Sequence, residues 1–276
     1  KVSLKKLSNQ HYTVISAAYN VENYVDKFFK SIINQSIDFK KHINIIIVDD
    51  GSTDRTAKKI KKWEKKFPKN IRYIYKDNGG QASARNLGLK YVESEWVTFI
   101  DADDFINFDY FLKVDKYILS NDNANLVVTN IYQFNEEKNI YEDVHPLRKK
   151  FNIKNNTIQI NSKENYIQEA VSGTFVRKSL IDHKNIYFNE EIKPVLEDTQ
   201  FISKYLLLNR QGSIGLVKDA TYYHRKSDKY NLNLKWDNYD RFNSVFSNGL
   251  LDICHLAKQK LGFVPIQVQN VVLYYV

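Results

Sequence analysis

The chain has 276 residues, of which 43% are hydrophobic and 14% aromatic, and its formal net charge is +9. This length allows one large domain, or one domain and part of another, with a sizeable core. A single cysteine, Cys254, excludes an internal disulfide and a zinc site built on cysteines, and it indicates a reducing compartment. The sequence has no run of about 18 apolar residues that would predict a membrane span. Its first ten residues lack the apolar segment of a signal peptide.

Apolar residues recur in patterns that predict alternating strands and helices over the first hundred residues. Short runs of consecutive apolar residues are typical of strands that are buried on both faces of a sheet. The predicted strands cover 12–17, 43–48, 71–75 and 96–100, and the predicted helices between them cover 22–35, 55–66 and 82–91. This order predicts an α/β fold, with a mostly parallel sheet that is flanked by helices and joined by right-handed crossovers.

The middle of the chain has a weaker pattern. We predict helices over 108–119 and 198–208, and strands over 126–129, 172–177 and 220–224. The polar, Asn-rich stretch 133–165 is too long for a simple connection, so we expect a mobile loop or a functional excursion there.

A long helical pattern over 237–261 places a domain boundary near Lys235. We therefore expect one domain over 1–235 and a C-terminal helical extension over 236–276, which begins a further module. The chain contains no Met and stops within an apolar run, so we expect it to be a fragment of a longer polypeptide.

Acidic residues follow two of the predicted strands. Asp49 and Asp50 come after one strand, and the segment 101–104 with its three acids comes after another. The carboxyl ends of parallel strands meet at one sheet edge, where open α/β sheets bind ligands. Asp101 and Asp103 suit Mg²⁺ or Mn²⁺, which would in turn bind phosphate oxygens. The alternative for an isolated Asp-X-Asp is a solvated acidic turn.

A third acidic pair, Glu197 and Asp198, begins a predicted helix, where the alternative role is a helix cap. Between the first two clusters, segment 78–89 places small residues before a helix that contains Arg85. Small residues allow close backbone approach, and Arg85 supplies a fork for phosphate or carboxylate. The segment is neither a Walker loop nor a G-x-G-x-x-G fingerprint, which counts against an ATPase and a dehydrogenase.

Taken together, these motifs resemble those of the family 2 glycosyltransferases with the GT-A fold, which is Rossmann-like. The matching motifs, in order, are residues 19–20, 48–54, 80–89, 101–104 and 197–198. The resemblance covers about residues 12–210 and implies a nucleotide-binding half over about 1–105 and an acceptor half over about 106–235. The sequence departs from the family pattern at Ala17, where a proline is common.

The resemblance also implies roles for individual residues. It implies that Asp198 is the general base and that the metal ligands are Asp101, Asp103 and His224. The residues implied to bind the nucleotide-sugar are Ala17, Tyr19, Asn20, Asp50, Asn78, Gly80, Arg85, Asp101, Ala102 and Arg225. The residues expected to line the acceptor site are Ser172, Gly173, Thr174 and Glu197. We interpret His145 and His183 as surface residues, Asp49 as shaping its turn, and Asp104 as a cap.

The function implied by the resemblance is an inverting transfer of a sugar from a nucleotide-diphosphate donor, above all a UDP-sugar, with Mn²⁺ or Mg²⁺ as cofactor. The acceptor would be a hydroxyl of a glycan or surface polymer, of the bacterial polysaccharide or teichoic acid type. One alternative is a non-catalytic nucleotide-sugar-binding subunit, which would have lost one of the acids. Another is a nucleotidyltransferase, which would carry a Gly-rich basic loop near the first strand.

Seven lysines cluster between positions 58 and 69. They form either a solvated helix face or a surface that contacts an anionic membrane. No recognised motif predicts a nucleic-acid partner. We therefore expect a protein of the bacterial cytoplasm, in peripheral contact with the inner face of the cell membrane. Oligomerisation through the C-terminal region is a further possibility left open by the sequence.

Overall fold

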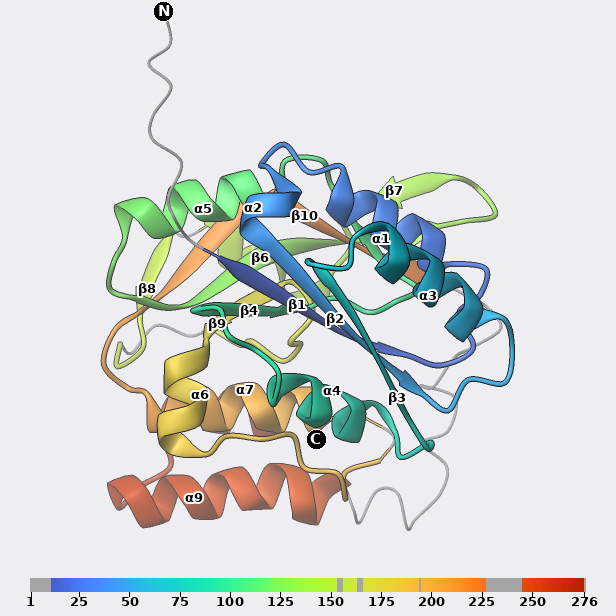
Figure 1. Cartoon of the computed structure of the whole chain (residues 1–276). Coiled ribbons are helices and arrows are strands. Elements are labelled where there is room, and N and C mark those ends of the chain that lie inside the picture. Colours follow the sequence, from blue (N-terminus) through green and yellow to red (C-terminus); the bar gives the residue numbers. More distant parts are fainter. Residues whose placement is uncertain (1–10, 153–155, 163–165, 194, 227–244, 276) are drawn as a thin grey trace, which may run out of the picture.

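The computed structural model describes residues 11–152, 156–162, 166–193, 195–226 and 245–275. It has an α/β fold in which a ten-stranded sheet carries helices on both faces (Figure 1). The strands are β1 (Tyr12–Ala18), β2 (Ile43–Asp50), β3 (Ile71–Lys76), β4 (Trp96–Phe99), β5 (Phe105–Ile106), β6 (Ala124–Asn135), β7 (Ile140–Glu142), β8 (Thr157–Gln159), β9 (Thr174–Arg177) and β10 (Ser213–Lys226). The α-helices are α1 (Val25–Ile33), α2 (Phe39–His42), α3 (Thr56–Lys66), α4 (Gln81–Leu89), α5 (Tyr110–Ser120), α6 (Lys178–Lys184), α7 (Glu197–Leu208), α9 (Asp252–Leu261) and α10 (Ile266–Tyr275). A 3-10 helix, η1, spans Pro146–Asn152, and a π-helical segment, η3, spans Val245–Leu251.

The first four long strands form a parallel half-sheet in the order β3-β2-β1-β4. Beyond β4 the sheet continues with β9, which is antiparallel to β4. The next strands in the sheet are β6, β10 and β5. β6 and β10 are parallel to each other, whereas β5 runs antiparallel to β10. The predicted α/β fold with flanking helices is confirmed, and its second half is a mixed sheet.

Hydrophobic side chains on the two faces of the sheet form two separate cores. In β2, Ile45 and Ile47 lie in the core under α1 and α3, whereas Ile46 and Val48 lie in the core under α4 and α7. Since successive side chains of a strand point to opposite faces, a strand buried on both sides must be apolar at consecutive positions. This explains why the apolar runs predicted strands so well.

Helix α4 lies close to the sheet because Gly88 removes a side chain at the contact with β1. A Cβ placed on Gly88 would lie only 2.7 Å from the Cγ2 of Ile15. The beginning of α4 lies beside the ends of β2 and β4, since the Gly80 N–H donates to Asp50 and the Gln81 side chain donates to Asp101. The predicted meeting of Asp50 and Asp101 near one sheet edge follows from this packing.

The described part of residues 133–165 contains regular secondary structure that the sequence pattern did not predict, and a functional role for this stretch stays a prediction. β6 extends to Asn135, and the stretch also contains β7, η1 and β8. Phe134, Phe151 and Ile158 anchor these short elements to the core. The anchors are too widely spaced in a polar sequence to produce a recognisable period, which is why the pattern suggested a loop.

The C-terminal extension consists of helices where it is described, and the helix predicted to end at Leu261 does end there. η3 leads into α9, and a separate α10 follows after Gly262 has ended α9 in a left-handed conformation. The boundary predicted near Lys235, and the first residues of the predicted helix, lie outside the described residues. Over the ranges that the structure describes, no helix has the length and apolar character needed to cross a membrane.

Candidate active site

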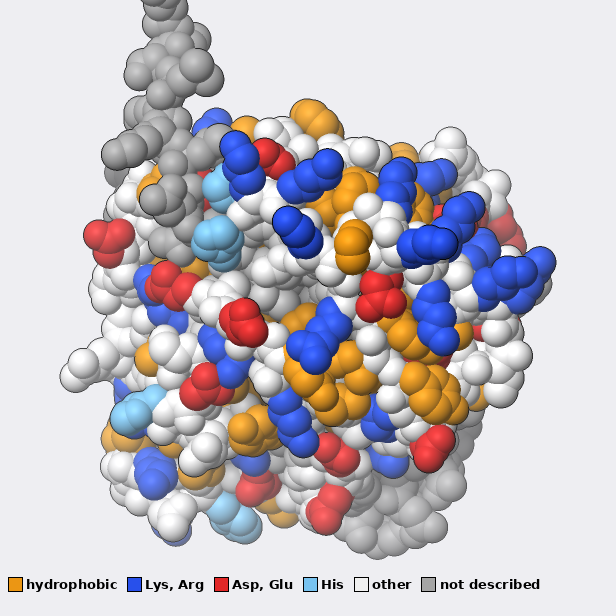
Figure 2. Space-filling view, in the orientation of Figure 1, with side chains coloured by type: hydrophobic (Ala, Val, Ile, Leu, Met, Phe, Trp, Pro, Cys, Tyr) orange, Lys and Arg blue, Asp and Glu red, His pale blue; other side chains and the backbone are white. Residues whose placement is uncertain are grey.

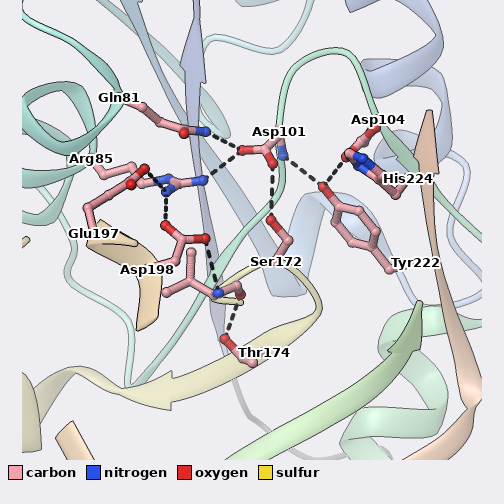
Figure 3. A network of polar contacts seen from close by, with 11 residues as sticks. Gln81, Arg85, Asp101, Asp104, Ser172, Thr174, Glu197, Asp198, Tyr222 and His224 are labelled. Atoms are coloured by element: carbon pink, nitrogen blue, oxygen red, sulfur yellow. Dashed lines mark hydrogen bonds and ion pairs between the residues drawn. The ribbon is translucent and has the colours of Figure 1, made fainter. Parts of the chain in front are cut away.

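The centre of the candidate site is the buried guanidinium of Arg85, on α4 (Figure 3). Its Nη2 donates to Oδ1 of Asp101 at 2.8 Å, and its Nη1 donates to Oδ1 of Asp198. The Oε1 of Glu197 lies 3.8 Å from the same Nη1. One cation thus holds acids from two distant parts of the chain, the turn after β4 and the first turn of α7. The three carboxylates raise the pKa of Arg85 further, despite its burial, so its charge is permanent.

The carboxylate of Asp101 is held from several sides. Its Oδ1 also accepts a hydrogen bond from Nε2 of Gln81 at 2.9 Å, and its Oδ2 accepts one from Oγ of Ser172 at 3.0 Å. The backbone N–H of Asp101 donates to the hydroxyl of Tyr222 at 3.2 Å. The orientation of Asp101 is therefore fixed before any ligand binds. Sequence reasoning missed Gln81 and Tyr222, because neither belongs to an acidic motif.

Asp104 is buried and serves the turn itself. Its Oδ2 accepts a hydrogen bond from the Tyr222 hydroxyl at 2.6 Å, and its Oδ1 accepts one from the backbone N–H of Arg225 at 2.7 Å. The Nδ1 of His224 lies 3.2 Å from Oδ2 of Asp104, whose charge raises the pKa of His224 to about 9. Asp104 is therefore a structural anchor between the turn and β10.

Asp103 lies among like charges. Burial and the nearby charges of Asp104 and Asp101 raise the pKa of Asp103 to about 7. Within the described ranges, no three His, Cys, Asp or Glu side chains converge on one point that could hold an ion. Mg²⁺ and Mn²⁺ sites commonly use one or two carboxylates and complete their shell with water and substrate phosphates. Asp103 and Asp101 fit that kind of site, whereas His224 is paired with Asp104.

Asp50 closes the turn that precedes α4. Its buried carboxylate accepts hydrogen bonds from Nζ of Lys76 at 2.7 Å and from the backbone N–H groups of Gly79 at 3.0 Å and Gly80 at 2.8 Å. The Nδ2 of Asn78 donates to the Asp50 carbonyl at 2.9 Å. Sequence reasoning missed Lys76, although Asp50 and Lys76 stand opposite each other at the ends of β2 and β3.

The segment after β1 carries an exposed aromatic ring and contacts the loop that follows β2. Tyr19 is 52% exposed, as expected for a ring free to stack on a base. The Oδ1 of Asn20 accepts a hydrogen bond from the backbone N–H of Thr53 at 2.8 Å, so Asn20 holds that loop in place. Ala17 is half-buried within β1. Ala102 is a buried residue of the acidic turn itself.

Asp198 stands at the first turn of α7, where the loop before β9 meets it. Its Oδ2 accepts a hydrogen bond from the backbone N–H of Val171 at 3.3 Å. Burial raises the pKa of Asp198, while the charge of Arg85 acts in the opposite direction. Burial and the Asp198 charge also raise the pKa of Glu197. A carboxylate with a raised pKa is a stronger base than an exposed aspartate, which suits a general base.

The predicted acceptor residues form the loop beside Asp198. Ser172 reaches Asp101, as described above. Gly173 has a φ of 72° and its carbonyl accepts a hydrogen bond from the backbone N–H of Thr129 at 2.8 Å. Thr174 is fully buried and its hydroxyl donates to the Val171 carbonyl at 2.6 Å, so it shapes the loop from behind.

Arg225 lies apart from the cluster around Arg85. Its Nε donates to the Asp103 carbonyl at 2.8 Å, and its guanidinium pairs with Glu136 and lies over the ring of Tyr24, 4.7 Å from the centroid. The structure therefore brings Arg225 beneath the acidic turn as a support. Its contact with a donor diphosphate stays a prediction. Of the two histidines interpreted as surface residues, His183 is exposed and His145 is half-buried.

Comparison with known proteins gives one family. The family model described as Glycosyl transferase family 2 matches residues 13–183. The minor teichoic acid biosynthesis protein GgaB of Bacillus subtilis is 32% identical over 277 residues, which cover 98% of this chain and 29% of GgaB. The poly(ribitol-phosphate) beta-N-acetylglucosaminyltransferase TarS of Staphylococcus aureus is 29% identical over 219 residues, covering 77% of this chain and 35% of TarS.

Among solved structures, residues 1–349 of S. aureus TarS in complex with UDP-GlcNAc superpose with a TM-score of 0.73 and 25% identity. The match covers 89% of this chain and 66% of that one. The described fold is therefore the fold of TarS. The chain spans about a third or less of the length of GgaB and TarS themselves.

Proposed function

Because the chain belongs to glycosyl transferase family 2, we propose that it transfers a sugar from a UDP-sugar to a hydroxyl of a surface-polymer acceptor, with inversion at the anomeric carbon. The observation that carries the proposal is the cluster around Arg85, which joins Asp101 on the donor side to Asp198 on the acceptor side. The names of GgaB and TarS support a wall polymer as the acceptor class, and the complex of TarS with UDP-GlcNAc supports a UDP-sugar donor.

The proposed donor site uses the turns after β1, β2 and β4. Tyr19 stacks on the base, and Asp50, already oriented by two backbone N–H groups, accepts from the base edge. Asp101 accepts from the ribose, since Gln81 and Ser172 fix its direction. A donor bound in this way has its diphosphate near Asp103.

The proposed chemical step is a single displacement. The acceptor oxygen attacks the anomeric carbon, the bond from that carbon to the diphosphate oxygen breaks, and the hydroxyl proton passes to the Asp198 carboxylate. Arg85 and the Val171 N–H hold that carboxylate in place, and they leave its remaining lone pairs for the acceptor. Attack from the face opposite the leaving group inverts the configuration.

Asp103 and Asp101 would hold a Mn²⁺ or Mg²⁺ ion. When bound, such an ion stabilises the negative charge of the departing nucleoside diphosphate. The fit rests on the donor set, since Asp101 and Asp103 offer hard oxygen ligands within one turn, and a divalent cation would relieve the repulsion between them. His224 would join the ion only by giving up its contact with Asp104.

We also propose that the protein works at the inner face of the bacterial cell membrane, as a peripheral protein. Six lysines on or just after α3 are exposed: Lys58, Lys61, Lys62, Lys65, Lys66 and Lys69. In Figure 2, Lys and Arg side chains gather on the part of the surface where α1 and α3 lie in Figure 1. A surface of this kind suits an anionic membrane.

The proposed reaction is tested by donor screening and by one substitution. UDP-, GDP- and dTDP-sugars are incubated with the protein, Mn²⁺ and a poly(polyol-phosphate) acceptor, and sugar transfer is measured. We expect UDP-sugars to be used, and Asp198→Asn to lower kcat by about a hundredfold or more. Asp182→Asn, at an exposed aspartate on α6, is the matched control and keeps full activity. Near-normal turnover by Asp198→Asn would contradict the assignment of Asp198 as the general base.

A further inference from the structure

The C-terminal extension is attached to α7, the helix that begins with Glu197 and Asp198. The Nε2 of Gln200 donates to the Asn248 carbonyl at 2.8 Å and to Oδ2 of Asp252 at 2.7 Å. The Nζ of Lys204 lies 2.9 Å from the same Oδ2. In Figure 1, α7 lies between the sheet and α9. The extension therefore covers the outer side of the helix that supplies the proposed base.

The residue before that helix has a strained backbone. Leu196 has a φ of 83°, in the left-handed region that bulky residues rarely adopt. Its side chain is buried in a small apolar cluster whose other buried members are Ile192, Val245, Leu250 and Val271. Three of these four come from η3 and α10. Strain of this kind persists only where the surrounding packing imposes it, and here much of that packing comes from the extension.

A single hydroxyl from α10 joins the two backbone segments beside Asp198. The hydroxyl of Tyr275 donates to Oε2 of Glu169 at 2.6 Å and lies 3.0 Å from Oγ1 of Thr199. Oγ1 of Thr199 itself donates to the Glu169 carbonyl at 3.2 Å. Thr199 is the residue after Asp198, and Glu169 lies two residues before Val171, whose N–H binds the Asp198 carboxylate.

From these contacts we infer that the extension belongs to the catalytic apparatus and that Tyr275 is a positioning residue for Asp198. The inference rests on the proposed role of Asp198 as the base. Tyr275 locks segment 169–171 to the start of α7, so that the carboxylate points at the acceptor hydroxyl. None of the proposed donor residues contacts Tyr275 in the described hydrogen-bond network, so donor binding does not depend on it.

The first test is Tyr275→Phe, which removes only the hydroxyl. We expect kcat to fall about tenfold or more, because a small misplacement of a catalytic group is costly. The KM for the UDP-sugar and the thermal stabilisation by UDP should stay within about twofold of the wild type, since only the base is displaced. An unchanged kcat, or a loss confined to donor KM, overturns the inference.

Tyr117→Phe is the matched control for this test. The hydroxyl of Tyr117 also contacts a threonine hydroxyl, that of Thr157 at 2.7 Å, but it joins α5 to β8, away from Asp198. Loss of the Tyr117 hydroxyl should lower the melting temperature about as much as Tyr275→Phe does, and it should leave kcat unchanged. An equal fall in kcat for Tyr117→Phe would mean that any lost tyrosine contact slows the enzyme, and it would overturn the inference.

A second pair of variants tests the contact between Thr199 and Tyr275 by changing Thr199, on α7. Thr199→Ser keeps the hydroxyl and should keep kcat, whereas Thr199→Ala should lower kcat as Tyr275→Phe does. The double variant of Thr199→Ala and Tyr275→Phe should be no slower than either single variant, because both substitutions break the same contact. Additive losses would contradict this.

Asp198→Asn separates this inference from the proposed function. If Asp198→Asn abolishes transfer and Tyr275→Phe does not affect it, the base assignment stands and only the inference falls. In the Asp198→Asn background, Tyr275→Phe should not change the residual rate, since Tyr275 acts through Asp198. If Asp198→Asn retains turnover, both the base assignment and the inference fall.

Discussion

At the scale of single residues, Asp103 lies among like charges, and this predicts its dependence on a divalent ion. Asp103→Asn removes one ligand and the charge that attracts the ion, so Mn²⁺-dependent stabilisation by UDP should be lost. Because the ion would contribute several kcal/mol to the reaction, we expect kcat to fall by about a hundredfold or more. The control is Asp109→Asn, a few residues along the chain and outside the acidic turn. A normal Mn²⁺-dependent shift in melting temperature for Asp103→Asn would contradict the metal assignment.

His145 predicts a pH dependence of stability. Burial and nearby positive groups, among them Lys150 and His224, lower the pKa of His145 to about 4. Its Nδ1 accepts a hydrogen bond from the Leu147 N–H at 3.2 Å, which only an unprotonated Nδ1 can do. The unfolded chain takes up a proton near pH 6.5 and the folded chain does not. Stability from this residue is therefore complete above about pH 6.5 and is lost as the pH falls toward 4.

His145→Asn checks this sign, because asparagine can accept the same hydrogen bond without titrating. The difference in melting temperature between wild type and variant is measured from pH 7.5 to pH 4.5. We expect the wild type to lose more stability than the variant on acidification. Parallel curves for the two proteins would mean that His145 does not titrate as described.

The sequence predicted which acids meet, but not what holds them. Asp50 and Asp101 follow parallel strands, so their neighbourhood at one sheet edge follows from the order of elements alone. The contacts of Tyr222 with Asp104 and of Arg225 with Glu136 depend on how β10 lies against segments about a hundred residues away. No local pattern encodes such contacts. Their residues can be recognised only once the strand pairing is known.

At the scale of elements, the contact of α4 with β1 predicts an unusual response to a helix-favouring substitution. Gly88→Ala adds a Cβ that would meet Ile15, so we expect a loss of about 1–3 kcal/mol in the free energy of unfolding despite the better helix propensity of alanine. In the Ile15→Ala background, the same substitution should cost less. Denaturant titration measures both effects.

The matched control is Gly249→Ala, in η3. A Cβ on Gly249 would have ordinary contact with Ile192 at 3.7 Å, so this glycine has room for a methyl group. We expect this variant to be neutral or more stable by up to about 1 kcal/mol. A loss at Gly249 as large as that at Gly88 would argue that packing against Ile15 is not the cause.

Strands buried on both faces were the elements best predicted from the sequence. β1, β2 and β4 begin at the predicted residues, because a double-sided core demands consecutive apolar residues. The short elements between β6 and β9 were missed because each is fixed by one or two anchors rather than by a repeating face. For α10 the sequence predicted helical character but no bounds, since only Val268 and Val271 of its residues are buried.

At the scale of the whole molecule, the exposed lysines on and just after α3 predict binding to anionic vesicles. Four substitutions to glutamine, at Lys58, Lys62, Lys65 and Lys69, should weaken binding to phosphatidylglycerol vesicles by about a hundredfold or more, since each lysine near the surface contributes about 1 kcal/mol. Transfer to a dissolved acceptor should not change. The control replaces four exposed lysines outside α3, namely Lys116, Lys184, Lys258 and Lys260. Equal loss in both variants would indicate an effect of net charge alone.

The arrangement of the site across the chain has a consequence for folding. Arg85 and Asp198 are 113 residues apart, and Tyr222 lies 118 residues from Asp104. Contacts between such distant residues form late and slowly, because the entropy of closing a long loop is lost before the contacts can stabilise it. Refolding from denaturant should therefore restore helical content well before it restores sugar transfer. The recovery of activity would then report the last stage of folding, in which α7 and β10 join the parallel half-sheet of β1 to β4.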